Sequence, residues 1–234
     1  RAEGQSQVPT EKVRLLYEAA SVYHRRLEDE ARAGELYART LVLDPEHVEA
    51  GEPLSEMYFR DGRWAELEPI LDMLVRKTDK KDLRERNLMY FRVARTEDEL
   101  GHHDKALKFY KMAYDLDATY LPTLLGRAAL LYKMEEWDQA FKIYQTILVH
   151  HRDAQQEGDI VDIFYRLGTI KLKLGERKKA LNMYEKALEI DAQHRATLLA
   201  IIDLQAQSNE WESVVQAKRA LAGAAPEEEQ VKLL

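Results

Sequence analysis

The feature that most constrains the fold is a pattern that returns along the chain at a nearly fixed distance. The three tryptophans, Trp64, Trp137 and Trp211, are separated by 73 and 74 residues. An Ala-x3-Tyr pattern followed by Leu-Asp or Ile-Asp returns at the same two distances, and its tyrosines are Tyr37, Tyr110 and Tyr184. A fixed period is the sequence signature of proteins whose structural units stack on their neighbours.

A finer period of 34 residues lies inside the larger one. Segments 106–117 and 180–191 place apolar or small residues at i, i+3, i+4 and i+7, which is the spacing of one helix face. Odd windows carry the Ala-x3-Tyr pattern and even windows carry the tryptophan, so two windows make the larger unit. Six windows fit the chain: 14–47, 48–81, 87–120, 121–154, 161–194 and 195–228.

The windows share small and aromatic residues at fixed positions. The clearest window contains Phe164, Leu167, Gly168, Gly175, Ala180, Tyr184 and Ala187, and window 87–120 contains Tyr90, Val93, Ala94, Gly101, Ala106, Tyr110 and Ala113. This pattern resembles the tetratricopeptide repeat (TPR), a pair of antiparallel helices, A and B. The resemblance implies an all-α, right-handed α-solenoid, or superhelix. Residues 1–13 would form an N-terminal segment and the start of the first helix, and residues 229–234 the start of a further, truncated helix.

Some windows predict local departures from the regular pattern. Gly51 stands where a large residue is expected, and Pro53 and Pro69 fall inside expected helices. Because a proline inside a helix costs about 3 kcal/mol, we expect helix A of window 48–81 to start late, near Pro53. Asp82 and Asp159 precede apolar runs with the spacing of helix caps, which predicts helix starts near residues 83 and 160. The tryptophans stand at position 17 of each even window, where we expect core residues between helices A and B rather than a ligand site.

Composition excludes several classes of function. The chain has no cysteine, which removes disulfides, zinc–thiolate sites and cysteine nucleophiles. Its net charge of −7 argues against a nucleic-acid partner, and it has no apolar run long enough for direct membrane insertion. We expect a cytoplasmic protein, with the periplasm as the alternative if a signal lies outside these residues.

Candidate chemical sites are few. The pairs His102–His103 and His150–His151 are adjacent rather than four residues apart, so we interpret them as histidines of turns and helix ends and expect no metal site. The chain lacks a Gly-rich phosphate loop, a G-x-S-x-G elbow and an H-E-x-x-H motif, so we expect no cofactor and no catalytic residues. The basic run 75–86 is interpreted as a solvated linker and helix start.

The remaining candidate is a surface. The resemblance implies that helices A line the concave wall, where positions 2, 5, 9, 12 and 13 of each window face a partner. Position 9 includes no Asn, so a carboxylate clamp of the chaperone type is not expected. Phe91 and Tyr165 have an alternative interpretation, which is packing against neighbouring repeats. The predicted partner-binding groove comprises Phe91, Arg95, Leu125, Tyr132, Lys133, Tyr165, Leu172 and Lys173.

These observations predict a non-catalytic scaffold or adaptor that binds a peptide or helix of a protein partner, as a fragment of a longer bacterial repeat protein. One alternative is a regulatory or substrate-recruiting portion of a larger enzyme. A second is an assembly lipoprotein of the pilotin kind, which would need a lipid-attachment cysteine outside this sequence. The sequence leaves the partner and the oligomeric state open.

Overall fold

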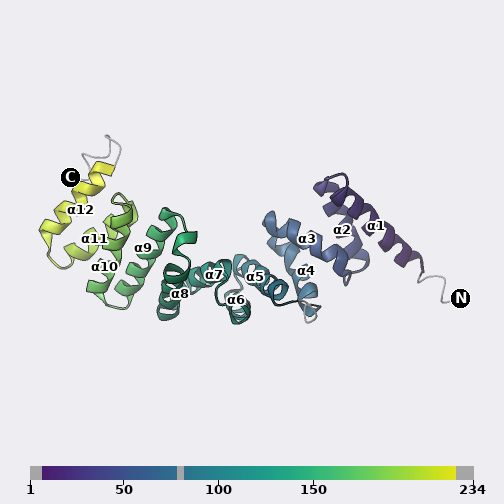
Figure 1. Ribbon diagram of the computed structural model, residues 1–234, viewed down its shortest axis with the longest axis horizontal. Coiled ribbons are helices and arrows are strands. Elements are labelled where there is room, and N and C mark those ends of the chain that lie inside the picture. Colours follow the sequence, from purple (N-terminus) through teal and green to yellow (C-terminus); the bar gives the residue numbers. More distant parts are fainter. Residues whose placement is uncertain (1–6, 78–81, 225–234) are drawn as a thin grey trace. The chain divides into compact units, whose positions relative to one another are not determined.

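The computed structural model describes residues 7–77 and 82–224, which form α-helices joined by short turns (Figure 1). This described part contains twelve α-helices, one short 3₁₀-helix and no strand. The elements are α1 (Gln7–Arg25), α2 (Glu30–Leu43), α3 (Val48–Arg60), α4 (Trp64–Arg76), α5 (Leu83–Glu99), α6 (His103–Leu116), α7 (Leu121–Lys133), α8 (Trp137–His150), η2 (Arg152–Ala154), α9 (Glu157–Lys173), α10 (Arg177–Ile190), α11 (Arg195–Ala206) and α12 (Trp211–Ala224). The odd-numbered α-helices are helices A and the even-numbered ones are helices B.

The turn between helices A and B has the same geometry in every window. Position 17 is the first residue of helix B in all six, whether it is Trp, Glu, His or Arg. Two residues earlier the backbone enters the left-handed region, which glycine adopts at low cost. Three windows place Gly62, Gly101 and Gly175 there, with φ of 69°, 81° and 78°, and three place Glu28, Glu135 and Asn209, with φ of 51°, 61° and 59°. The helix pair therefore imposes this turn even where the sequence lacks glycine.

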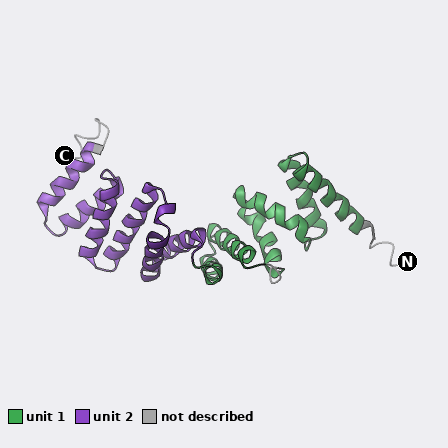
Figure 2. Ribbon diagram, in the orientation of Figure 1, with its two compact units in different colours: residues 1–118 green, residues 119–234 purple. Residues whose placement is uncertain are grey.

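The chain divides into two compact units, residues 1–118 and 119–234 (Figure 2). The first contains helices α1–α6 and the second contains α7–α12, and within each unit consecutive helices pack as antiparallel pairs. The described helices thus form an all-α solenoid of helix pairs, as predicted. The right-handed superhelix stays a prediction.

The repeated tyrosines fill the cores of the units. Tyr37 and Tyr110 are fully buried in the first unit, and Tyr184 is fully buried in the second. A Cβ atom at Gly168 would lie 2.5 Å from ring atoms Cδ1 and Cε1 of Tyr184. Glycine therefore lets α9 approach α10 closely enough for the tyrosine ring to pack against its backbone, as the repeat pattern predicts.

Gly51 shows how one window compensates for a missing side chain. A Cβ atom at Gly51 would lie 2.7 Å from the terminal methyl group of Met73 on α4. Met73 is buried and belongs to the core cluster of the first unit. A flexible methionine from helix B thus fills the space that a large residue of helix A fills in other windows.

The expectation that helix A of window 48–81 starts near Pro53 is wrong. Helix α3 begins at Val48 and continues through Pro53. Its first turn is fixed by His47, whose Nδ1 accepts a hydrogen bond from the Ala50 backbone N–H at 3.2 Å, and by the burial of Ala50 and Leu54. Capping and burial outweigh the single backbone hydrogen bond that the proline cannot donate.

The two predicted early helix starts are both present, but one has a different cap. Helix α5 begins at Leu83, and the Asp82 carboxylate accepts from the Glu85 backbone N–H at 2.9 Å, as expected. Helix α9 begins at Glu157, three residues before the predicted position. Asp159 lies inside it and accepts from the Gln156 backbone N–H at 3.3 Å, so the expectation that Asp159 precedes the helix is wrong.

Two of the three tryptophans pack as predicted. Trp64 and Trp137 are half-buried, and each meets the aromatic residue at position 12 of its own window edge-to-face: Phe59 with centroids 5.5 Å apart and Tyr132 at 5.4 Å. Trp211 is 59% exposed, so interpreting it as a core residue is wrong. The corresponding position 12 is an alanine in the last window and offers no ring.

Two predictions fall on residues outside the described part. These are the further helix start at 229–234 and the middle of the basic run 75–86, at 78–81. Among the described helices, none combines the length and apolar character that crossing a membrane requires.

Candidate partner-binding surface

In the second unit, Tyr132 at the end of α7 lies in a cluster with α9. The Arg166 guanidinium lies over its ring, 5.2 Å from the centroid. Burial raises the pKa of the Tyr132 hydroxyl, and a hydrogen bond with Thr169 partly offsets this shift. Arg166 also interacts with the hydroxyl of Tyr144 on α8, whose pKa burial raises. Tyr132 is therefore held by rings and polar groups from two helices.

Thr169 joins this cluster to Tyr165 and Tyr184. Its hydroxyl donates to the Tyr165 carbonyl at 3.1 Å and lies 3.3 Å from the Tyr184 hydroxyl. Because the threonine proton is used on the carbonyl, the Tyr184 hydroxyl donates to Thr169. The Tyr165 ring lies 5.9 Å from the rings of both Tyr184 and His194. Both rings belong to the window of Tyr165 itself, and Tyr165 also packs against the core cluster that α10–α12 form.

The other predicted residues of this unit differ in exposure. Lys133 and Lys173 are exposed, and neither forms an ion pair with the described residues. Leu125 is 37% exposed on α7. Leu172 is half-buried against the core cluster of α10–α12. Of the predicted residues in this unit, two lysines without an ion pair and one leucine are therefore exposed on helices A.

The first unit contains the remaining two predicted residues. Phe91 on α5 is half-buried, with its ring 6.2 Å from Phe59 and 6.5 Å from Tyr110. Arg95 forms an ion pair with Glu99 one turn later on the same helix. Phe91 is therefore part of the packing between repeats, and the Arg95 charge is already neutralised.

Exposed aliphatic residues recur at the positions expected to face a partner. Five of the exposed large hydrophobic residues occupy position 2, 5 or 9 of their windows, and they are between 37% and 53% exposed. Large apolar side chains on a surface raise the question of what covers them. The five are Leu15, Val22, Leu88, Leu125 and Leu199.

Arg166, Thr169 and His194 belong to the cluster but were absent from the sequence-based prediction. Arg166 stands at position 6, outside the positions assigned to the groove. His194 closes window 161–194, and its Nδ1 lies 2.7 Å from the Thr197 hydroxyl. Position 9 is Ala129 in one window of this unit and Thr169 in the next, so the sequence does not indicate that Thr169 joins several tyrosines. These residues become recognisable only from contacts between helices.

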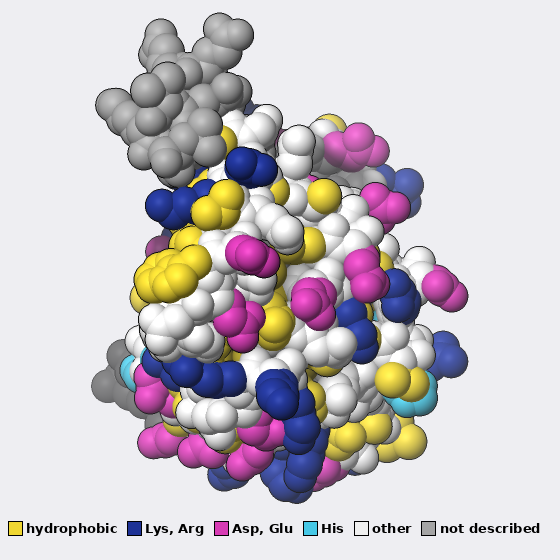
Figure 3. Space-filling model, turned by 90° about the vertical axis from the view of Figure 1, so that its left-hand side faces the viewer, with side chains coloured by type: hydrophobic (Ala, Val, Ile, Leu, Met, Phe, Trp, Pro, Cys, Tyr) yellow, Lys and Arg dark blue, Asp and Glu magenta, His cyan; other side chains and the backbone are white. Residues whose placement is uncertain are grey.

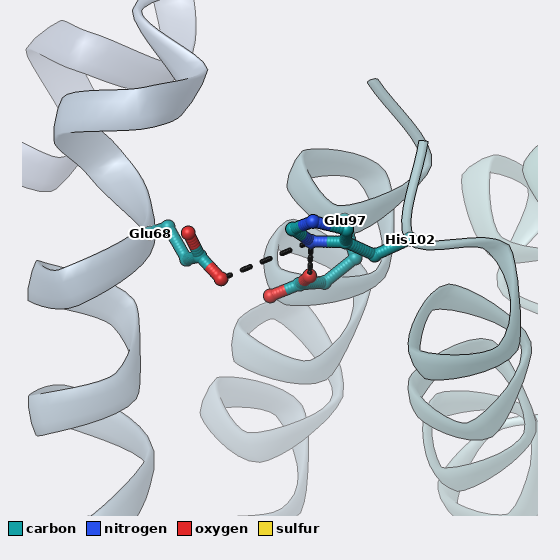
Figure 4. A group of neighbouring side chains, drawn as sticks. All are labelled: Glu68, Glu97 and His102. Atoms are coloured by element: carbon teal, nitrogen blue, oxygen red, sulfur yellow. Dashed lines mark hydrogen bonds and ion pairs between the residues drawn. The ribbon is translucent and has the colours of Figure 1, made fainter. Parts of the chain in front are cut away.

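A separate group of polar side chains joins α4, α5 and the turn before α6 (Figure 4). Glu97 is 1% exposed, and its Oε2 lies 2.8 Å from His102 Nδ1. Glu68 Oε1 lies 3.9 Å from the same nitrogen. A carboxylate pair and an imidazole at this spacing are the ligand types of a metal site, and these three are the candidate ligands in the described part of the chain.

Lys105 gives the group another explanation. Its ammonium lies 2.7 Å from Glu97 Oε1, 3.4 Å from Glu68 and 3.5 Å from Asp72. Burial alone would lower the pKa of Lys105, but the hydrogen bond with Glu97 and the neighbouring carboxylates have the opposite and larger effect. The pKa is therefore raised, and Lys105 keeps its charge. A metal ion would have to displace this charge. We therefore interpret the group as an ion network that ties α4 to α5 and α6.

The turn histidines differ in exposure, because His102 is exposed, as the sequence suggested, whereas His103 is half-buried. His102 is bound to Glu97, and His103 Nδ1 lies 3.5 Å from Asp98. On the face drawn in Figure 3, Lys and Arg side chains lie among Asp and Glu side chains, with apolar ones between them.

The described geometry is matched by a known repeat family. Residues 120–193 and 89–120 each match a family described as tetratricopeptide repeat. A curated relative, "Protein CTR9 homolog" from Arabidopsis thaliana, is 26% identical over 111 residues. The match covers 47% of this chain, and the matched residues span only 10% of that protein.

Solved structures resemble the chain in fold. YrrB, described as a TPR protein with an unusual peptide-binding site, matches with a TM-score of 0.63 at 17% identity, over 86% of this chain and 97% of its own. MamA from Desulfovibrio magneticus RS-1 matches with a TM-score of 0.62 at 14% identity, over 79% of this chain and 95% of its own. BtubC from P. vanneervenii matches with a TM-score of 0.59 at 19% identity, over 86% of this chain and 91% of its own.

Proposed function

The chain belongs to the tetratricopeptide repeat family, and on that basis we propose that it is a non-catalytic scaffold that binds a peptide or helix of a protein partner along its helices A. The observation that carries the proposal is that exposed aliphatic residues recur, in each unit taken by itself, at the positions of helices A that the repeat pattern assigns to partners. The peptide-binding site described for YrrB, a protein of the same fold, is consistent with this proposal.

The second unit offers the more specific part of the surface. Tyr132 is held by Arg166, Trp137 and Thr169, so its ring does not have to be ordered when a partner binds. Ordering a side chain at an interface costs about 0.5–1.5 kcal/mol, and a preformed cluster avoids that cost. Aromatic and arginine side chains in such clusters are typical anchors.

Lys133 and Lys173 suggest the charge of the partner. Each is the last residue of a helix A, next to Tyr132 and Leu172 respectively, and each lacks an acidic partner among the described residues. A carboxylate on the partner would gain attraction from either ammonium without breaking an existing ion pair. We therefore expect a segment that combines apolar or aromatic side chains with acidic ones.

Peptides selected by display against the whole chain provide the test. The selected peptide is titrated against the double variant Lys133→Glu/Lys173→Glu, in which both charges on helices A are reversed. The matched control is Lys142→Glu/Lys178→Glu, which reverses two exposed lysines on helices B α8 and α10. We expect at least tenfold weaker binding for the first variant and unchanged binding for the control, with equal circular dichroism. Equal affinity for both variants would reject helices A as the binding surface.

A further inference from the structure

The first unit has a trough along α2, which is lined by α3 over its whole length and by α4 over part of it. One hollow of about 710 Å³ is lined by α2 residues 30–39, by α3 and by Arg63. A second of about 270 Å³ is lined by Leu41, Val42, Pro45 and residues of α3 and α4. Both hollows are lined by Ala38 and Tyr58, so they join along the length of α2.

The side of α2 along this trough differs from its counterparts in the other two-repeat units. It presents Ala31, Gly34, Ala38 and Val42, and Val42 is 78% exposed. The corresponding residues of α6 are Asp104, Leu107, Lys111 and Asp115, and those of α10 are Lys178, Leu181, Glu185 and Glu189. Three of the four positions are charged in both counterparts, as expected for helices facing water. Small and apolar residues on α2 raise the question of what covers this face.

The wall opposite α2 is apolar as well. It is formed by Pro69, Ile70 and Met73 of α4. In α8 the corresponding residues are Lys142, Ile143 and Thr146, so a lysine replaces the proline. Both walls of the trough are thus less polar than their counterparts elsewhere in the chain.

The charges at the ends of the trough are already paired. Arg60 donates to both carboxylate oxygens of Glu30 at one end, and Arg76 donates to Glu46 at 2.7 Å at the other. Glu35 and Arg39, in the middle of α2, are exposed and form no ion pair with the described residues. They are one helix turn apart, with Ala38 beside them. A partner that supplies one positive and one negative charge at this height would pair both side chains.

We propose that the occupant of this trough is α2 of a second copy of the chain, packed antiparallel across a two-fold axis near residue 37. Residues 35 and 39 are equidistant from such an axis, so Glu35 of each copy meets Arg39 of the other. Ala31 and Val42 are related by nearly the same axis, which brings a small residue opposite an exposed valine. A two-fold contact requires a self-complementary surface, and this face has one. Gly34 and Ala38 permit close approach of the two helices.

Sedimentation velocity over a range of concentrations tests the proposal on the whole chain. We expect a reversible dimer for the native sequence and a monomer for Val42→Glu, which introduces the residue that α10 carries at this position. The matched control is Val149→Glu on α8, another valine that is 75% exposed, and it should dimerise as the native chain does. Circular dichroism should be the same for all three. A native chain that stays monomeric at every concentration, or a Val42→Glu variant that still dimerises, overturns the proposal.

Charge reversal tests the orientation. Glu35→Arg and Arg39→Glu should each weaken dimerisation by about tenfold, because each replaces two attractions with two repulsions across the axis. The double variant should restore the native dissociation constant. If the double variant is as weak as either single one, Glu35 and Arg39 do not face each other and the antiparallel α2 contact is wrong.

Discussion

Gly168→Ala tests how closely α9 and α10 approach. An alanine Cβ would lie 2.5 Å from two ring carbons of Tyr184 and 3.1 Å from a third, whereas carbon atoms pack at about 3.5–4.0 Å. The ring is 1% exposed and cannot swing into solvent. Overpacking of this kind costs about 3 kcal/mol at the upper end of its range, against a gain of about 1 kcal/mol from replacing glycine inside a helix. We expect a net loss of about 2 kcal/mol in the free energy of unfolding.

Gly158→Ala is the control for the same substitution in the same helix. Gly158 lies in the first turn of α9, and a Cβ atom there meets nothing within 4 Å. Helix propensity alone then acts, so this variant should be more stable than the native chain by about 0.5 kcal/mol. The two alanine substitutions should therefore change the free energy of unfolding in opposite directions.

Urea unfolding followed by circular dichroism measures both variants. Because repeat proteins can unfold in parts, amide hydrogen exchange in α9 and α10 should be measured as well. Exchange should be faster there in Gly168→Ala and unchanged or slower in Gly158→Ala. An unfolding midpoint for Gly168→Ala at or above that of Gly158→Ala would refute the close-approach argument, because it would mean that the tyrosine ring moves aside at no cost.

Three further substitutions test other contacts. Gly51→Ala should change the urea midpoint little, because the atom in its way is the end of a flexible methionine side chain that can rotate. Lys105→Met should lower the free energy of unfolding in urea at neutral pH by about 2 kcal/mol, because it leaves Glu97 buried without its ammonium partner. This loss is smaller than that for a fully buried ion pair, because Lys105 is partly exposed. The pKa of Lys105 is raised from its ordinary 10.5, so its contribution is complete below that pH and should disappear as the pH rises beyond it; a constant difference between variant and native chain up to higher pH would contradict this. Ala206→Tyr should supply the missing ring for Trp211 and shift its fluorescence to shorter wavelength, whereas an unchanged spectrum would show that the tyrosine does not cover it.

The sequence was sufficient to predict the helix pairs because a given position of the repeat has the same structural role in every window. Position 17 starts helix B in every window, and Tyr37, Tyr110 and Tyr184 are buried as the pattern requires. The late start near Pro53 was mispredicted because a general proline penalty was applied without the tertiary context. The capping imidazole of His47 and the burial of Ala50 act in the opposite direction and cannot be read from the repeat pattern.

The candidate surface was only partly predictable. The repeat pattern places Tyr132, Lys133 and Lys173 on helices A, but it does not reveal that Arg166 lies over the tyrosine ring. That contact joins residues 34 positions apart, and position 6 has no consistent chemistry across the windows. Arg95 was expected to offer a charge to a partner, yet Glu99, one turn away, neutralises it. A list of outward-facing positions therefore overestimates how many side chains are available for binding.

The tryptophans show why a regular spacing does not guarantee a regular environment. The three occupy the same position at the start of helix B, so the backbone places each indole ring in the same way. Whether the ring is covered depends on position 12 of the same window, where Phe59 and Tyr132 cover two of them and Ala206 does not cover Trp211. Periodicity thus determines where a side chain starts, whereas its burial depends on the neighbour. The same reasoning applies to α2, which occupies the same place in its window as α6 and α10 do in theirs. It differs from them in the small and apolar residues on its outer face.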